Sequence, residues 1–171
     1  KAAIPKQNDA DFSTTPAAVE FFQWRGALIR HVACGLHHTL AVAWEPASAG
    51  AGVVVARLYA WGFGDRGRLG TGATGAQKLP ARVLLPICDD PHSGHVVAAA
   101  GGDQHSLALL SDGRVYAFGD NEHGALGLGR ASDRPVELPE SVALPFRSGG
   151  AVRVSCGARH SACVTASGAV L

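Results

Sequence analysis

The chain has 171 residues, of which 15 are basic, 14 acidic and 22 glycine, and its formal net charge is +1. This length is sufficient for a buried core, but the balanced charge disfavours nucleic acid as the main partner, because phosphate binding requires a basic surplus on one face. The glycine content favours short strands and tight turns over long helices.

The first 18 residues (1–18) are polar and rich in turn-forming residues, which predicts a linker or a strap across the surface. The sequence starts without an initiator methionine or a signal-peptide-like apolar block, so we expect it to belong to a longer chain. Residues 19–24 are apolar again. Their pattern fits a short strand, a short helix or the closing segment of a preceding unit, and it does not choose among these.

A short block occurs three times, at residues 32–42, 99–109 and 154–164. Each copy has a glycine, two variable residues, a histidine, a serine or threonine, and then small or apolar residues. Internal repetition of this kind indicates a repeat architecture. The constant glycines and histidines, for which we expect structural roles, are Gly35, His38, Gly102, His105, Gly157 and His160.

A second block follows the first. Residues 58–72 align without gaps with residues 115–129, and residues 167–171 match the start of a third copy. The two blocks are farther apart in the first copy than in the second, which predicts an inserted surface loop at about residues 43–55. The constant positions of the second block, also expected to be structural, are Trp61, Gly62, Gly67, Gly70, Phe118, Gly119, Gly124 and Gly127.

Each repeat contains four strand-like runs. Asp112-Gly113, between the second and third runs of the middle copy, is a hairpin signal. A sheet of four short strands cannot bury both of its faces alone, so it must stack on its neighbours as a β-propeller blade. The runs of the middle copy are residues 96–100, 106–110, 115–119 and about 135–138.

The two blocks resemble the regulator of chromosome condensation repeat, through Trp61-Gly62 and the run at residues 118–127. The resemblance covers residues 32–171, with one departure at Gly64, where the family usually has asparagine. It implies an all-β fold, a partial β-propeller of about two and a half to three four-stranded antiparallel blades from a parent propeller of about seven blades. The blades are expected at about residues 19–86, 87–145 and, incomplete, 146–171, with the remaining blades elsewhere in the parent.

Three patterns that suggest chemistry are interpreted as structural, and no catalytic residue, cofactor or metal is expected. Residues 62–67 read G-x-G-x-x-G, but a dinucleotide site needs a helix directly afterwards, and residues 68–72 are a poor helix start. The Cys-Gly-x-x-His runs occupy equivalent places in successive blades, so they do not converge on a metal. Adjacent histidine and hydroxyl residues point to opposite faces of a strand, so we expect the hydroxyls to satisfy backbone groups.

The loop tips of the second block differ between copies, although the frame around them is constant. Asp65, Arg66 and Arg68 in one copy correspond to a region with Glu122 and His123 in the next. Loops on a rigid scaffold carry variable binding groups, so these five residues are candidate contacts for a partner. The alternative is a plain solvated rim.

The repeat scaffold and the balanced charge favour a non-catalytic scaffold for protein–protein interaction in a larger assembly. The family resemblance implies an alternative, guanine-nucleotide exchange on a Ran-like small GTPase, which requires no nucleophile because it follows from differential binding. Chromatin binding ranks lowest, since Arg25, Arg30 and His31 form only a small basic cluster.

The four cysteines form no C-x-x-C pair, and no N-x-S/T sequon occurs. Reduced thiols and an intracellular location are therefore expected, and nucleus, cytoplasm and organelle are equally compatible with the sequence. No apolar run reaches the roughly 20 residues of a membrane span, so no membrane partner is expected.

Overall fold

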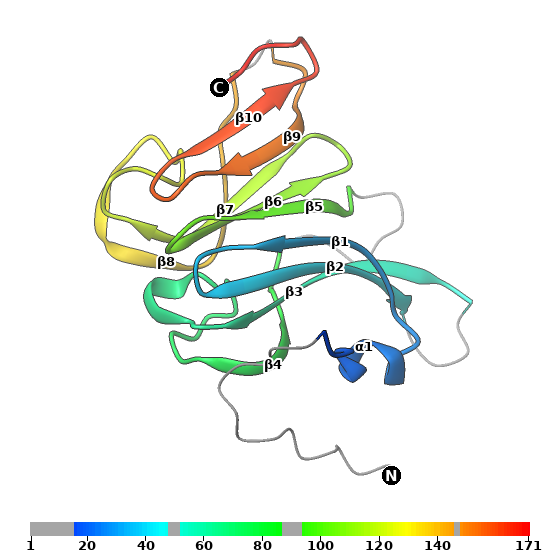
Figure 1. Cartoon of the computed structure of the whole chain (residues 1–171). Helices are drawn as coiled ribbons and strands as arrows, with labels where there is room; N and C mark the ends of the chain where they lie inside the picture. The colour runs from blue at the N-terminus through cyan, green and yellow to red at the C-terminus, as the bar shows by residue number, and fades with distance from the viewer. Residues whose placement is uncertain (1–15, 48–51, 87–93, 146–147) are drawn as a thin grey trace.

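The structure, a computed structural model, describes residues 16–47, 52–86, 94–145 and 148–171. Their strands form three antiparallel sheets of four, four and two strands, and each sheet is built from strands that are consecutive in the sequence (Figure 1). The predicted all-β partial propeller is confirmed.

The strands follow the repeats. The first sheet contains β1 (Leu28–Cys34), β2 (His38–Pro46), β3 (Val54–Gly62) and β4 (Gln77–Arg82), with the 3-10 helix η1 (Asp65–Gly67) before β4. The second contains β5 (Val96–Gly101), β6 (His105–Leu110), β7 (Val115–Asn121) and β8 (Ser132–Ser141). The third contains β9 (Ala151–Cys156) and β10 (Ser161–Thr165). Each of the four runs predicted for the middle copy lies within a strand of the second sheet.

The two four-stranded sheets have the same register. His38 pairs with Gly62, and His105 pairs with Gly119, across the second and third strands. Both glycines have positive φ, 107° and 111°, and a Cβ on either would lie 2.5 or 2.4 Å from a backbone carbonyl oxygen. Glycine is therefore required after the aromatic residue of each third strand, because the backbone is outside the normal L-residue range and the strands approach closely there.

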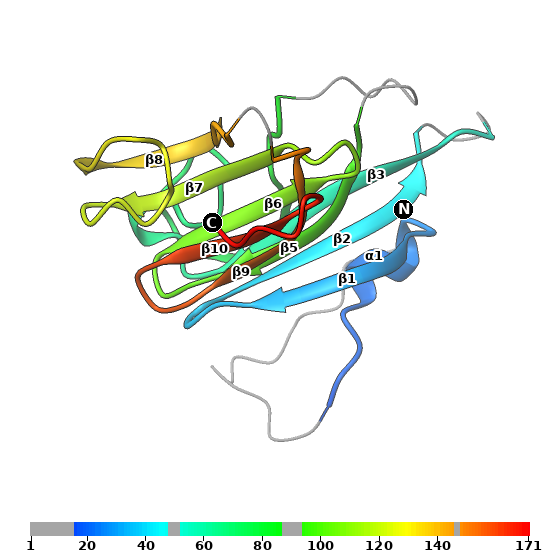
Figure 2. The same cartoon turned by 90° about the horizontal axis from the view of Figure 1, so that it is seen from above.

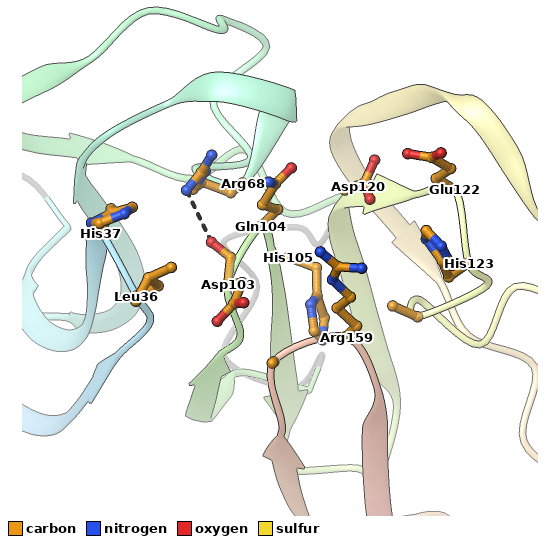
Figure 3. A pocket seen from close by; sticks show the side chains of 12 residues that line it. Leu36, His37, Arg68, Asp103, Gln104, His105, Asp120, Glu122, His123 and Arg159 are labelled. Atoms are coloured by element: carbon orange, nitrogen blue, oxygen red, sulfur yellow. Dashed lines mark hydrogen bonds between the residues drawn. The ribbon is translucent and has the colours of Figure 1, made fainter.

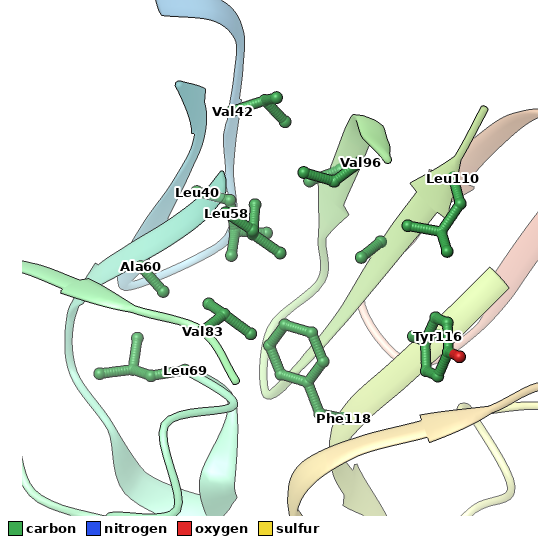
Figure 4. Close-up of a cluster of buried hydrophobic side chains, with 12 residues drawn as sticks. Leu40, Val42, Leu58, Ala60, Leu69, Val83, Val96, Leu110, Tyr116 and Phe118 are labelled. Atoms are coloured by element: carbon green, nitrogen blue, oxygen red, sulfur yellow. The ribbon is translucent and has the colours of Figure 1, made fainter. Parts of the chain in front are cut away.

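The sheets stack face to face with hydrophobic cores between them (Figure 4). Because successive side chains of a strand point to opposite faces, each sheet gives one set of apolar residues to each neighbour. The core between the first and second sheets includes Leu40, Val42, Leu58, Leu69, Val96, Leu110, Tyr116 and Phe118. The core between the second and third sheets includes Leu107, Leu109, Val115, Ala117, Ala151 and Cys163.

The turns that join the first two strands of the three sheets lie side by side at one end of the molecule. Figures 1 and 2 show the β1–β2, β5–β6 and β9–β10 turns together on the left of both views. The variable residues of the first repeated block are in these turns. The stacking of the sheets therefore brings positions that are far apart in the sequence to one surface.

The apolar segment at residues 19–24 contains helix α1 (Glu20–Trp24). Phe22 is buried against the outer face of the first sheet, and its ring centroid lies 5.4 Å from that of Tyr59. An isolated helix of this length is not stable in water, so this packing holds it in place. Of the predicted linker or strap, residues 1–15 lie outside the described residues. In the part of the chain that is described, no helix has the length and apolar character needed to cross a membrane.

The insertion expected near residues 43–55 lengthens two strands. β2 continues to Pro46 and β3 begins at Val54, and these two residues pair with each other. The connection between the strands is therefore residues 47–53, of which 48–51 lie outside the described residues. β2 and β3 therefore continue as an antiparallel, hydrogen-bonded pair beyond the rest of the first sheet.

Candidate functional site

The constant histidine of one sheet binds the hydroxyl of the next sheet. His38 Nε2 lies 2.8 Å from Ser106 Oγ, and the hydroxyl of Ser106 donates to the carbonyl oxygen of Arg68 at 2.8 Å. A serine hydroxyl has one hydrogen, so the histidine Nε2–H is the donor to Oγ. This three-group contact joins the first and second sheets, and it confirms that the hydroxyl satisfies a backbone group.

The same contact recurs at the next joint. His105 Nε2 lies 3.1 Å from Ser161 Oγ, and Ser161 donates to the carbonyl oxygen of Ala125 at 2.7 Å. Ala125 is the repeat equivalent of Arg68. The histidine–hydroxyl pairs are therefore used twice in the same way, as links between sheets.

Burial keeps these histidines neutral. Burial, with the positive charge of Arg68 as a further cause, lowers the pKa of His38 to about 4. Burial also lowers the pKa of His105. A neutral ring suits the joint, because Nδ1 of His38 has no hydrogen-bond partner among the described residues and a second proton would be buried without an acceptor.

The glycine three residues before each histidine leaves room for the ring. A Cβ on Gly35, Gly102 or Gly157 would lie 2.1 to 2.2 Å from the imidazole Cε1 of the histidine that follows it. Backbone groups of these turns also connect the sheets, since the amide of Leu36 donates to Gly102 and the amide of Asp103 donates to Ala158. These main-chain bonds do not depend on the side chains of the two variable residues.

The variable residues line a cavity of about 500 Å³ at the ends of the three sheets (Figure 3). Each sheet contributes the pair that lies between its constant glycine and histidine. The pairs are Leu36 and His37, Asp103 and Gln104, and Ala158 and Arg159. The second block and the frame add Arg68, His105, Asp120, Glu122, His123 and Ala125.

Of the five predicted loop-tip residues, Arg68 is not at a tip. Its side chain is buried, with the residue 4% exposed, and it donates to the backbone oxygens of Asp65 at 2.8 Å and Asp103 at 2.9 Å. Burial lowers the pKa of Arg68, and nearby carboxylates oppose this effect. It therefore connects the first sheet to the second, although it also forms part of the cavity wall.

Arg66 is held by acidic groups of the second sheet. Its Nη2 lies 2.7 Å from Asp120 Oδ1 and 3.2 Å from Glu122 Oε2. Its backbone has a φ of 61°, which is unfavourable for a residue with a side chain. Glu122 and His123 line the cavity as expected of loop tips, whereas Asp65 is exposed outside its lining. Partner contact at these residues stays a prediction.

One group of described residues has the composition of a metal site. The ligand atoms of Asp120, Glu122 and His123 lie within 4.8 Å of one another. Arg66 already forms ion pairs with both carboxylates. A cation would have to displace this guanidinium.

The sequence analysis missed the pairs between glycine and histidine, which supply half of the cavity lining. Their signal was present, because these two positions vary within an otherwise constant block. The structure shows that both kinds of variable position meet at one end of the sheets (Figure 3).

The stacked four-stranded sheets and their recurring joint define a segment of a β-propeller built from tandem repeats. Residues 56–109 and 112–164 match the regulator of chromosome condensation (RCC1) repeat family, and residues 96–125 match a second family description of the same repeat. The chain belongs to the RCC1 repeat family.

Curated relatives contain the repeat in longer proteins. The chain is 33% identical over 142 residues to the human E3 ubiquitin-protein ligase HERC2, covering 83% of the chain and 3% of that protein. It is 33% identical over 158 residues to the ultraviolet-B receptor UVR8 of Arabidopsis thaliana, covering 92% and 32%. It is 37% identical over 109 residues to an RCC2 homolog of Xenopus laevis, covering 63% and 20%. The chain thus spans about a third or less of these relatives.

Solved structures share the fold. Human WBSCR16 superposes with a TM-score of 0.66 at 27% identity, over 84% of this chain and 34% of that one. Prp20p of Saccharomyces cerevisiae, which binds Gsp1p and histones, superposes with a TM-score of 0.65 at 22% identity, over 83% of this chain and 32% of that one. At that identity the similarity to Prp20p concerns the fold alone.

Proposed function

We propose that the chain is a non-catalytic part of an RCC1-type propeller that binds a protein partner through the cavity at the ends of its three sheets. The rest of the propeller is supplied by the parent, within an intracellular assembly. The observation that carries this proposal is that constant and variable repeat positions have different roles in the structure. Constant histidines and serines link the sheets, and variable positions supply most of the cavity lining.

The chemistry of the cavity supports recognition of a protein. Its wall combines two arginines and three acidic residues with histidine, glutamine and apolar residues from three separate sheets. Polar side chains on a rigid frame give specificity without a large apolar surface. The recurring histidine and serine residues, which a hydrolase would need for catalysis, are engaged in the joints.

Steric filling of the cavity tests this proposal. The tagged parent protein is used to capture partners from cells, and the captured proteins are quantified by mass spectrometry for the wild type and for Ala158→Trp. Ala158 is exposed and lines the cavity, so a large side chain there blocks the surface without entering a core. We expect Ala158→Trp to lose specific partners at least tenfold.

The matched control is Ala143→Trp. Ala143 is exposed and follows Val142, whose amide donates to Val115 at the opposite end of the second sheet. This variant should retain the partners. Equal capture by the two variants and the wild type would show that the cavity is not the binding surface.

Exchange on a Ran-like small GTPase is the competing function, and the same capture separates the two. A GTPase recovered only from nucleotide-depleted lysate, followed by accelerated release of labelled GDP by the purified parent, would favour exchange over a scaffold role. Stable recovery of a multi-protein complex, independent of nucleotide, is the result expected here. Chromatin binding ranks below both because of the net charge of +1.

A further inference from the structure

Among the cationic groups around the cavity, Arg66 and Arg68 already have partners and Arg159 does not, and among the acidic groups of its lining Asp103 is the one without a side-chain partner in the described part of the chain. This inference rests on the proposed function, because it names the chemistry of the protein that the cavity would bind. Arg66 pairs with Asp120 and Glu122 on one side of the cavity. A charge that is already paired contributes little to a new contact, because the existing pair must be broken first.

The buried arginine is also engaged. Arg68 donates to the backbone oxygens of Asp65 and Asp103, burial lowers its pKa, and the carboxylates of Asp65, Asp103 and Asp120 oppose that effect. The residue is 4% exposed, so its guanidinium is engaged in the frame of the cavity and little of it is open to a partner.

Arg159 is different. It is exposed, it has no hydrogen bond or ion pair among the described residues, and it reaches from the β9–β10 turn into the cavity (Figure 3). Its guanidinium is a planar group with five donors, and it matches a carboxylate with two parallel hydrogen bonds. In a concave site such a pair is screened less than on an open surface.

The equivalent positions in the other two sheets are also donors. His37 and Gln104 stand at the same repeat position as Arg159, second between the glycine and the histidine, and both line the cavity. Each sheet therefore presents one side chain that is able to donate a hydrogen bond. An extended segment lying across the three sheets would meet these donors in succession.

We propose that the cavity binds an acidic segment of a partner protein, with a carboxylate on Arg159 and further acceptors on Gln104 and His37. A basic segment fits less well, since it would have to displace Arg66 from both Asp120 and Glu122. The occupant is thus a run of aspartate or glutamate in an extended loop or tail.

The test uses fluorescence anisotropy of two labelled peptides, hexaglutamate and hexalysine, with the full chain at low ionic strength. We expect hexaglutamate to bind, and Arg159→Gln to weaken it about fivefold or more, as befits a charge-assisted contact. The matched control is Arg153→Gln, an exposed arginine of β9 outside the cavity lining, which changes the net charge equally. It should change hexaglutamate binding by less than about twofold. Arg159→Lys keeps the positive charge but loses the planar group that donates two parallel hydrogen bonds. Its affinity for hexaglutamate should lie between those of the wild type and Arg159→Gln.

Three results would overturn the proposal: no hexaglutamate binding by the wild type, equal loss in Arg159→Gln and Arg153→Gln, or hexalysine binding that Glu122→Gln removes. Failure of this proposal is distinguishable from failure of the proposed function. If Ala158→Trp abolishes partner capture while Arg159→Gln leaves it intact, the cavity binds a partner but does not read an acidic segment.

Discussion

Two contacts between sheets can be compared: the joint between the first and second sheets and the joint between the second and third. Their hydrogen bonds are similar near the turns, and their packing differs farther from the turns. Both have the histidine–serine–carbonyl link, at 2.8 Å in one and 3.1 Å in the other. Both also have a main-chain bond between neighbouring turns. The part of each contact that lies near the turns is therefore set by the Gly-x-x-His-Ser/Thr block together with one backbone carbonyl of the second block, and at the first contact Arg68 adds a bond to the Asp103 backbone oxygen.

The outer halves differ because the third sheet has two strands in the described residues and the second has four. At the first joint, a Cβ on Gly67 would lie 2.9 Å from the Glu137 Cα, and a Cβ on Gly70 would lie 2.7 Å from the Phe118 ring. Their equivalents, Gly124 and Gly127, have nothing within 4 Å and a single atom at 3.5 Å. The same glycines thus hold the turn shape at both joints, but only at the first do they also allow close packing.

The largest contrast is expected from the paired substitutions Gly70→Ala and Gly127→Ala. Both residues have positive φ, 64° and 67°, so each alanine should lose about 1 kcal/mol of stability through backbone strain. Gly70→Ala also forces a methyl against Phe118, and the total loss should be about 3 kcal/mol. Urea unfolding of the two variants measures the difference. Equal losses would mean that the packing at the first joint is as loose as at the second.

Acidification should weaken the first joint. Folded His38 has a pKa of about 4, whereas histidine ordinarily has a pKa of 6.5, so between these pH values the folded chain binds fewer protons at this residue than the unfolded chain does. The free energy of unfolding should therefore fall as the pH decreases from 6.5 to 4, by about 3 kcal/mol from this residue.

Denaturant titrations across this range check the effect of pH. His38→Gln should flatten the pH dependence more than His105→Gln. Arg68 adds to the lowering of the pKa of His38 by burial, whereas a backbone hydrogen bond with His160 and nearby aspartates oppose the lowering of the pKa of His105 by burial. A slope that persists in His38→Gln would contradict the assignment.

Removal of the bridging hydroxyl should have a smaller effect. Ser106→Ala leaves the His38 donor and the Arg68 carbonyl oxygen without their partner in a fully buried position, which should cost about 2 kcal/mol. Ser161→Ala removes the equivalent link where water has access, and it should cost about 1 kcal/mol or less. Thermal unfolding compares the two, and a larger loss for Ser161→Ala would reverse the ranking of the joints.

The smallest effect is expected from Arg66→Gly. Glycine removes the strain of a left-handed residue, about 1 kcal/mol, while the partly exposed ion pairs that it loses contribute about the same or less. The free energy of unfolding should change by about 0.5 kcal/mol or less. A loss of several kcal/mol in calorimetry would show that Arg66 is a main contact of the first joint.

Most of the fold was predictable because its determinants are local and repeated. Glycine at fixed positions, an Asp-Gly hairpin and alternating apolar residues set the strands, and the recurrence of the two blocks in the same order predicted the stacking. The sequence did not predict helix α1 uniquely, since its position depends on the packing of Phe22 against Tyr59 of a distant strand. The extension of β2 and β3 was hidden because small residues and proline are typical of loops.

The candidate site was predictable only in part, for a related reason. The sequence shows that Arg68 varies between repeats, but not that its side chain turns inward to bond Asp103 across the joint. The cavity itself requires the relative placement of three sheets. Variability within a repeat indicates which positions are free to change, and packing decides which of them share a surface.

The main-chain bonds between neighbouring turns have a consequence for engineering. The amides of Leu36 and Asp103 connect adjacent sheets whatever side chains these residues carry. A combinatorial library at the six positions between glycine and histidine would therefore sample new recognition surfaces on an unchanged skeleton. Selection from such a library for binding to a chosen protein would change the residues that face the cavity separately in each repeat.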